Sequence, residues 1–299
     1  MKQWYRDVNF APHNRKLIET MNGVVDDYAA QGFRLTVRQV FYQLVARGHI
    51  ENTMQSYKRV ASIINDGRMA GLIDWDAIED RTRSVKKRSA WGSASDIVQS
   101  AADSFHMDMW DNQNYRVFVI VEKQALEGIM QSVCNQWDVP LVAARGYPSV
   151  SVVKEMVEQY LGPCIEEGKE PVILHFGDHD PSGIDMTRDL IDRIQIFAEA
   201  YGAVDLQRLA LNMNQIHAYK PPPNPAKTTD SRFAGYMREH GTESWELDAL
   251  EPRVLVDLVE RTTQSYIDDG AWAERTEEIE GLRAKLQDAA ARFRDEQDD

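Results

Sequence analysis

The sequence has few of the features that mark secreted or membrane proteins. It contains two cysteines, Cys134 and Cys164, which are far apart and lack the spacing of metal ligands. We therefore expect reduced thiols and neither a disulfide framework nor a zinc site. No run of about eighteen apolar residues is present, so no membrane-spanning helix is predicted. The first residues lack the apolar core of a signal peptide, and a cytoplasmic protein is expected.

Two further absences narrow the class of function. No glycine-rich phosphate loop of the P-loop type occurs, so no ATP site of that kind is predicted. The net charge of −14 argues against a protein that simply coats DNA, because such a protein is normally basic. The charge is uneven, however: residues 34–88 are rich in lysine and arginine, and residues 274–299 are acidic. An enzyme with a local basic surface and modest, salt-sensitive DNA affinity fits this balance.

Two apolar segments predict the centre of the fold. Residues 117–121 and 171–176 are β-branched runs without polar alternation, the pattern of strands buried on both faces of a parallel sheet. Helical patterns follow them at 124–136 and 184–201, which makes βα units. With 299 residues of ordinary globular composition, the chain has room for this α/β domain and a second domain.

Acidic residues follow both predicted strands. Glu122 comes directly after the first, and Asp178 and Asp180 come after the second. Ligands of open α/β sheets bind beyond the carboxyl ends of the strands, so we expect these carboxylates to converge. They would repel one another unless a cation neutralised them, and oxygen ligands favour Mg²⁺ first and Mn²⁺ second. An aspartate after a strand can instead cap the next helix. His179, between the aspartates, is expected to point the other way.

The N-terminal part predicts a small helical domain. Helical patterns cover residues 13–31, 35–48 and 53–70, and an extended segment at 72–75 follows them. Thr36 and Gln39 have the spacing of a capping box. This order suggests a winged-helix or helix-turn-helix module, although any small helical bundle gives the same pattern.

Tyr42 lies off the apolar stripe of the second predicted helix. It is about 130° from the centre of that stripe at about 100° per residue, so we interpret it as a surface residue. A tyrosine in such a place can simply contact a partner protein. Arg38 lies one turn earlier on the same side of the helix. The stripe consists of Val37, Val40, Phe41, Leu44 and Val45.

Basic residues are candidates for DNA contact. Lys58, Arg59 and Arg68 lie on the third predicted helix, the natural recognition helix of such a module. Lys86 and Lys87 belong to a denser basic run that follows it. The alternative interpretation for the helix is an ordinary solvated basic surface.

The motifs together resemble a known family. Glu122-Lys123 after a strand, then Gly146-Tyr147-Pro148, then Asp178-His179-Asp180-Pro181-Ser182-Gly183, is similar in order and type to a Toprim domain. The version it resembles is that of the topoisomerase VI A subunit and its relative, the meiotic double-strand-break transesterase. Arg38-Gln39-Val40-Phe41-Tyr42 resembles the R-[DE]-[IV]-[FY]-Y segment that carries the nucleophile in the winged-helix domain of these families. Gln39 departs from the pattern, which has an acidic residue there.

The resemblance implies a mechanism and a set of partners. By analogy, Tyr42 attacks a DNA phosphate and forms a 5′-phosphotyrosyl link. Mg²⁺ is held by Glu122, Asp178 and Asp180, Glu122 also serves as general acid–base, and Arg38 steadies the phosphate. The family implies a homodimer in which the tyrosine of one protomer meets the metal of the other. It also implies a separate ATPase like the topoisomerase VI B subunit. The short forms called topoisomerase VIII, or mini-A, are the most similar type.

The expected fold is therefore α/β: an N-terminal winged-helix domain (1–111), a Rossmann-like Toprim domain with a parallel sheet (112–269) and a C-terminal amphipathic, acidic helix (270–299). Residues 206–218 are expected to be strand-like, and the prolines at 221–225 predict an irregular surface loop. Asp248 is interpreted as the cap of a helix over 252–268, although a place close to the metal is an alternative for it and for Glu246.

Two other functions fit the same residues. The first is a metal-dependent DNA nuclease, associated with a plasmid or a defence system, that uses the carboxylates and water. In that case Tyr42 is structural. The second is a DNA-binding regulator whose carboxylate site is vestigial, and the intact set of Glu122, Asp178 and Asp180 argues against it.

Overall fold

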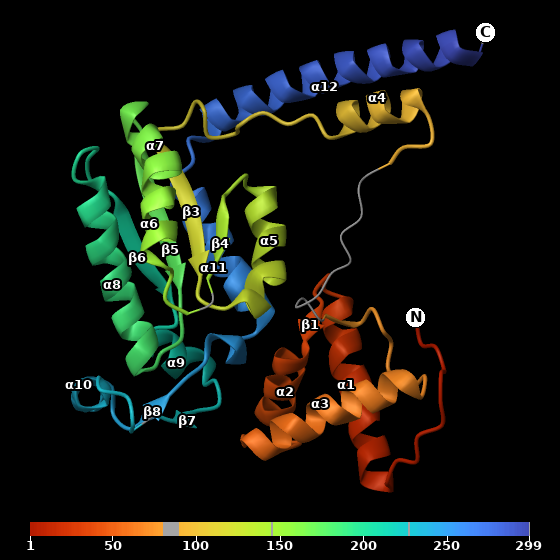
Figure 1. The fold of residues 1–299 in the computed structure, drawn as a ribbon, viewed down its shortest axis with the longest axis vertical. Helices are drawn as coiled ribbons and strands as arrows, with labels where there is room; N and C mark the ends of the chain where they lie inside the picture. Colours follow the sequence, from red (N-terminus) through yellow and green to blue (C-terminus); the bar gives the residue numbers. More distant parts are fainter. Residues whose placement is uncertain (80–89, 145, 227, 299) are drawn as a thin grey trace.

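The computed structural model describes residues 1–79, 90–144, 146–226 and 228–298, with side chains as far as residue 292. A small helical part and a larger α/β part with a parallel sheet make up the chain (Figure 1). Lys86 and Lys87, expected to contact DNA, lie outside the described residues. No helix within the described ranges is long and apolar enough to cross a membrane.

The helical part forms as its sequence predicts. Its helices are α1 (Pro12–Ala29), α2 (Val37–Ala46) and α3 (Met54–Met69). The predicted capping box of Thr36 and Gln39 begins α2, and the Thr53 side chain accepts a hydrogen bond from the backbone N–H of Ser56 at the start of α3. Apolar side chains of all three helices share one core, which includes Met21, Leu44 and Ile64.

The segment after α3 differs from the expected wing. Residues 72–75 form turns, and the extended pairing comes later, where β2 (Ile78–Glu79) runs parallel to β1 (Leu35–Thr36). The physical reason is Arg68, whose buried guanidinium donates to the backbone carbonyls of Trp75 and Ile78 and holds the loop against α3. Within the described part of the chain, this region contains no antiparallel wing hairpin.

The α/β part confirms the predicted parallel sheet. Its four strands are β3 (Tyr115–Val121), β4 (Leu141–Ala143), β5 (Glu170–Phe176) and β6 (Asp205–Ala210), in the order β4-β3-β5-β6. All neighbouring pairs are parallel. The strand-like segment expected over 206–218 was only half right, because helix α9 (Met213–Tyr219) follows β6.

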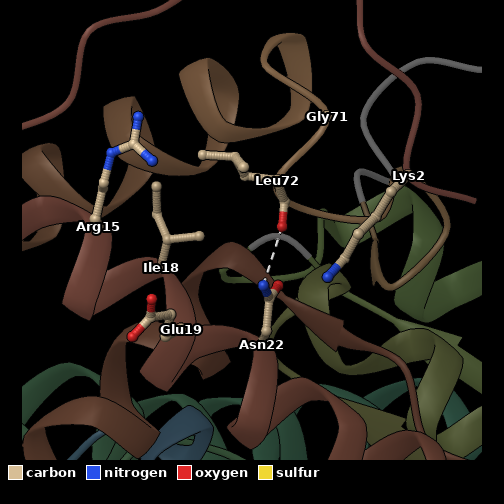
Figure 2. Close-up of a pocket in the computed structure, with 7 residues that line it drawn as sticks. All are labelled: Lys2, Arg15, Ile18, Glu19, Asn22, Gly71 and Leu72. Carbon is tan, nitrogen blue, oxygen red and sulfur yellow. Dashed lines mark hydrogen bonds between the residues drawn. The ribbon is translucent and has the colours of Figure 1, made fainter.

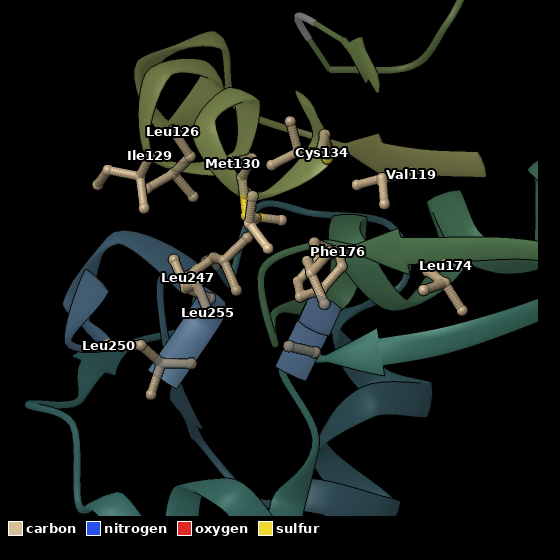
Figure 3. Close-up of a cluster of buried hydrophobic side chains, with 14 of the residues drawn as sticks. Val119, Leu126, Ile129, Met130, Cys134, Leu174, Phe176, Leu247, Leu250 and Leu255 are labelled. Atoms are coloured by element: carbon tan, nitrogen blue, oxygen red, sulfur yellow. The ribbon is translucent and has the colours of Figure 1, made fainter. Parts of the chain in front are cut away.

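Alternation along β3 gives the sheet two buried faces. Val117, Val119 and Val121 pack in one core, and Phe118 and Ile120 pack in another. Helices α5 (Glu127–Gln136) and α11 (Pro252–Gln264) contribute to the first core, part of which appears in Figure 3. Helix α6 (Val150–Met156), the π-helical turn η2 (Val157–Leu161) and helix α8 (Pro181–Ala198) contribute to the second.

The remaining elements are short, apart from the last helix. They are η1 (Gln124–Leu126), α7 (Gly162–Glu166), α10 (Phe233–His240) and η3 (Leu247–Ala249). The proline-rich segment is not wholly irregular, since β7 (Asn224–Pro225) pairs with β8 (Glu243–Ser244). Proline at an edge position permits this. The predicted C-terminal helix is α12 (Asp269–Asp298), and α4 (Ala94–Asp103) lies along it (Figure 1).

Candidate active site at the carboxyl edge of the sheet

The sheet order places the predicted carboxylates at one point. From β3 the chain moves to β4 on one side and later to β5 on the other, so the strand order reverses between β3 and β5. Crevices for ligands form at such a reversal, beyond the carboxyl ends of the strands. Glu122 follows β3 and Asp178 follows β5 two residues after Phe176, and the backbone N–H of Asp178 donates to Glu122 Oε2 over 3.0 Å.

The turn after β5 has a conformation that requires glycine at its end. A Cβ atom at Gly183 would overlap the backbone carbonyl of Asp178. The carboxylate of Asp180 accepts a hydrogen bond from the Gly183 N–H over 2.6 Å and caps α8. Asp180 therefore has the capping role that the sequence left open as an alternative. Its side chain points to the start of α8, whereas Asp178 Oδ1 accepts from the N–H of Leu247 over 2.7 Å.

His179 points away from the carboxylates, as alternation predicts. Its Nδ1 lies 2.9 Å from the Tyr236 hydroxyl, and its ring packs against His240 and Trp245. Its backbone also pairs with Trp245 through two hydrogen bonds of 2.8 and 2.9 Å. The turn that carries Asp178 and Asp180 is thus tied to the segment around residue 245.

The carboxylates of Glu122 and Asp178 are destabilised as anions. Burial, and then the charge of Asp178, raises the pKa of Glu122 to about 7. Burial also raises the pKa of Asp178 to about 6, although Lys123 opposes this shift. Desolvation and mutual repulsion have this effect on paired carboxyl groups, and a cation placed between them relieves both.

Lys123 occupies the centre of a group of carboxylates. Its Nζ lies 2.9 Å from Asp178 Oδ1, 2.9 Å from Glu246 Oε2 and 3.4 Å from Asp248 Oδ2. Burial lowers the pKa of Lys123, but Asp248, Asp178 and Glu246 outweigh burial and leave the pKa above its ordinary value. Asp248, whose side chain is fully buried, is therefore an ion-pair residue, and our prediction that it caps a helix was wrong.

A second, half-buried cation, Arg208, supports the backbone of the same turn. Its guanidinium donates to the carbonyl oxygens of Gly177, Asp178 and Gly183 over distances of 2.6 to 3.1 Å, and to the Thr187 hydroxyl over 2.5 Å. Burial lowers the pKa of Arg208 to about 10, against the opposing charge of Glu122. Sequence reasoning missed Arg208 because it lies in the middle of β6, where nothing distinguishes it from a surface residue.

Tyr42 is buried, which corrects its interpretation as a surface residue. Its side chain is only 3% exposed, and its ring contacts Phe41 edge-on. The physical reason is that α2 is buried on all sides over residues 39–44, because η3 packs on it in addition to α1 and α3. Helical periodicity shows which side faces the helical core, and it cannot show that another domain covers the opposite side.

The Tyr42 hydroxyl meets groups of the α/β part. Asn224 and Glu246 line the same pocket as Tyr42, and the charge of Glu246 acts on its hydroxyl. Burial, and then the negative charge of Glu246, raises the pKa of Tyr42. Tyr42 and Glu246 line a pocket of about 80 Å³ with Arg38, Phe41, Asn52, Thr53, Met54, Tyr57 and Asn224.

Arg38 lies beside Tyr42, as the helical spacing predicts. Its guanidinium is 3.3 Å from Glu246 Oε2 and 3.8 Å from Asp248 Oδ2, and it lies over the ring of Tyr57. Asn52, at the end of the loop before α3, donates to the carbonyl of Pro223 and to Asn224 Oδ1. These contacts join the helical part to the α/β part at the pocket.

One chain of contacts links the predicted nucleophile to the predicted carboxylates. Tyr42 shares a pocket with Glu246, Glu246 pairs with Lys123, and Lys123 pairs with Asp178, whose backbone donates to Glu122. Sequence reasoning considered Glu246 only as a group near the metal, and the signal for it was its place in the segment Glu246-Leu247-Asp248-Ala249-Leu250 before a predicted helix.

The donor set at the sheet edge suits a hard cation, although the side chains are not arranged around one. Glu122 and Asp178 supply oxygen ligands of the kind that such a cation prefers. Asp178 faces Lys123 and Asp180 caps α8, so Asp180 would have to change rotamer to join them. Among the described residues, no three His, Cys, Asp or Glu side chains are grouped as metal ligands.

The predicted DNA-contacting residues of α3 divide into two kinds. Lys58 and Arg59 are exposed, and Arg59 also donates to Asn14 Oδ1 over 2.7 Å. Arg68 is only 8% exposed and is engaged with the loop after α3, so its prediction as a DNA contact was wrong. Its position in the last turn of α3 directs it under that loop.

Another pocket, of about 330 Å³, lies in the helical part and involves none of the predicted site residues. It is lined by Lys2, Arg15, Ile18, Glu19, Asn22, Gly71 and Leu72 (Figure 2). Asn22 there donates to the carbonyl of Leu72 over 2.9 Å, which ties α1 to the loop after α3.

Comparison of the chain with protein-family models, with curated proteins and with solved structures finds no match.

Proposed function

We propose that this protein cleaves DNA by transesterification, with Tyr42 as the nucleophile and a divalent cation at Glu122 and Asp178. The observation that carries the proposal is the series of neighbours from Tyr42, which shares a pocket with Glu246, through the ion pairs of Lys123 with Glu246 and Asp178. Tyr42 lies about eighty residues or more before Glu122 and Asp178 in the sequence. It belongs to the helical part of the fold, whereas the two carboxylates belong to the α/β part. Nothing in helical packing alone would bring a tyrosine hydroxyl to buried carboxylates.

Each residue of the site has its own role in the proposed reaction. The Tyr42 oxygen attacks phosphorus, and the bond to the 3′ oxygen breaks. Glu122 acts as the general acid that gives a proton to that oxygen, because it lies at the same edge of the sheet as the proposed cation. Arg38 lies beside Tyr42, and the guanidinium donors that do not face Glu246 can bind the phosphate while that ion pair stays closed. When bound, Mg²⁺ or Mn²⁺ would stabilise the charge on the phosphate oxygens. Asp180, which caps α8, would join Glu122 and Asp178 in holding the cation if it left that cap.

Access to Tyr42 sets a condition on this mechanism. A pocket of about 80 Å³ is smaller than a nucleotide, so DNA reaches the hydroxyl only when the contact between α2 and η3 widens. Exposed Lys58 and Arg59 on α3 would attract the phosphate backbone to this side of the helical part. The resemblance implies that the tyrosine meets the metal of a partner protomer, whereas the contacts that support this proposal lie within one chain, so the proposal pairs Tyr42 with the carboxylates of its own chain. A homodimer and a separate ATPase subunit remain its expected partners.

The burial of Tyr42 favours one alternative, a hydrolytic DNA nuclease that uses the carboxylates and water. In that case Tyr42 serves to join the two parts of the chain, and its raised pKa has no chemical role. The two functions differ in the product, because hydrolysis leaves free DNA ends and transesterification leaves protein attached to 5′ ends.

The test incubates the protein with supercoiled plasmid and Mg²⁺ or Mn²⁺, stops the reaction with detergent and compares samples with and without protease. We expect breaks with protein on the 5′ ends, abolished by Tyr42→Phe. Tyr28→Phe is the matched control, because Tyr28 is a buried tyrosine of the same helical core that does not line the pocket. Equal cleavage by Tyr42→Phe with free ends would establish the nuclease, and uncut plasmid would contradict both functions for the chain alone.

A further inference from the structure

We propose that Glu246 positions the Tyr42 hydroxyl and accepts its proton when Tyr42 attacks, an assignment that rests on the proposed transesterification. A tyrosine is a weak nucleophile at neutral pH, since its ordinary pKa is about 10, and so it needs a neighbouring base or cation. The geometry around Tyr42 supplies both.

Glu246 is held firmly in place. The residue before it, Trp245, exchanges two backbone hydrogen bonds with His179, and the N–H of the residue after it, Leu247, donates to Asp178 over 2.7 Å. The backbone of Glu246 is therefore fixed to the turn that carries the aspartates. Its side chain is 27% exposed and lines the pocket that Tyr42 also lines.

Two cations keep Glu246 in the form that can accept a proton. Lys123 Nζ lies 2.9 Å and Arg38 Nη1 lies 3.3 Å from the same oxygen, Oε2. Burial alone would raise the pKa of Glu246, but Lys123, and then Arg38 and Tyr42, lower it below its ordinary value. Glu246 is therefore ionised at neutral pH and ready to take a proton.

No other pocket group can take this role. Among the described residues that line the pocket, Glu246 is the sole carboxylate. Arg38 has no acceptor atom, and Asn52, Thr53 and Asn224 are not bases. The charged groups around Tyr42 are Arg38 on its own helix and Lys123 and Glu246 of the α/β part, and Tyr57 is the titratable group that α3 contributes.

In the attack by Tyr42, one bond to phosphorus forms and one breaks. The proton of the Tyr42 hydroxyl passes to the Glu246 carboxylate while the tyrosine oxygen forms a bond to phosphorus. The bond from phosphorus to the 3′ oxygen breaks, and that oxygen takes a proton from the general acid of the proposed function. The reverse reaction returns the proton from Glu246 to Tyr42 and reseals the DNA. No oxidant or other reactant is required.

The first measurement is the rate at which protein becomes attached to DNA as a function of pH. We expect Glu246→Gln to slow attachment at neutral pH about 100-fold or more, with partial recovery at higher pH as solvent base replaces the carboxylate. Glu246→Asp should retain part of the rate. The matched control is Glu243→Gln, an exposed glutamate three residues away that does not line the pocket. Attachment that depends on Tyr42 but is unchanged by Glu246→Gln would overturn the proposal.

The second measurement does not depend on cleavage. Tyrosines labelled with ¹³C at the ring carbon that bears the hydroxyl report ionisation by NMR, and Tyr42→Phe assigns the Tyr42 signal. We expect Glu246→Gln to shift that signal and lower the pKa of Tyr42, because a negative charge beside the hydroxyl is removed. Urea unfolding of each variant shows that it is folded. An unchanged Tyr42 signal would overturn the assigned contact, whereas cleavage by Tyr42→Phe would overturn the function itself.

Discussion

Two regions meet at Lys123, and they are held together in different ways. The sheet edge, from Glu122 to the Gly177–Gly183 turn, is fixed largely by backbone groups: Arg208 donates to several of its carbonyls, and Trp245 pairs with His179. The contact of the helical part with the α/β part depends mainly on side chains: Arg38 with Glu246 and Asp248, and Asn52 with Asn224.

The difference has a consequence for mechanism. Backbone hydrogen bonds of a buried turn are lost only when the turn unfolds, whereas side-chain contacts between two parts can open while each part keeps its own core. The sheet edge is suited to hold carboxylates in a fixed place. The contact around Tyr42 is suited to open for DNA. Lys123 belongs to both regions, so it is the most sensitive position.

Lys123→Met is expected to have the largest effect on stability. It leaves three carboxylates, those of Asp178, Glu246 and Asp248, without their shared cation. Removal of one partner from a buried ion pair costs about 3–5 kcal/mol in unfolding free energy. Added Mg²⁺ should restore part of the loss, because the freed oxygens suit a hard cation. Urea unfolding with and without Mg²⁺ measures both effects, and a variant as stable as the wild type would show that the cluster contributes little.

Gly183→Ala tests whether the turn at the sheet edge is rigid. The added Cβ would overlap the Asp178 carbonyl, which is backbone and cannot move aside, so we expect a loss of about 1–3 kcal/mol and a displaced turn. The control is Gly235→Ala in α10, where no atom lies within 4 Å of the added Cβ. Thermal unfolding compares them. Equal melting temperatures for the two variants would show that the Gly177–Gly183 turn is not rigid.

Asn52→Ala tests the side-chain contact between the helical part and the α/β part, and it should have the smallest effect on stability. It removes the hydrogen bonds of Asn52 to Pro223 and Asn224, which together contribute about 1–2 kcal/mol to the association of the two parts. We expect the unfolding free energy of each core to change little and the amides of α2 to exchange faster with deuterium. Unchanged exchange in α2 would indicate that packing of η3 on α2 holds the contact without these bonds.

The backbone architecture at the sheet edge was largely predictable from sequence. Strands β3 and β5 contain apolar runs without polar alternation, and the acidic residues after them had to lie at the carboxyl edge of a parallel sheet. The capping box of Thr36 and Gln39 likewise placed the start of α2. These features depend on neighbours in the chain, and local pattern therefore reveals them.

The side chains that complete the site were not predictable in the same way. Tyr42 is buried by η3, which lies about two hundred residues later in the chain, and no periodicity within α2 reports that contact. Asp248 precedes a helix and has the spacing of a cap, but Lys123 and Arg38 attract it more strongly than the helix end does. Asp180, by contrast, is the cap that its position after a strand allows.

The most direct test of the central claim is to identify the residue that becomes attached to DNA. After cleavage and nuclease digestion, trypsin should release the peptide of residues 39–47, in which Tyr42 is the sole tyrosine. We predict that mass spectrometry finds this peptide with a nucleotide on Tyr42, and that Tyr42→Phe abolishes both the modified peptide and the breaks. Full cleavage with no modified peptide, and with free 5′ ends, would contradict the assignment of Tyr42 as the nucleophile.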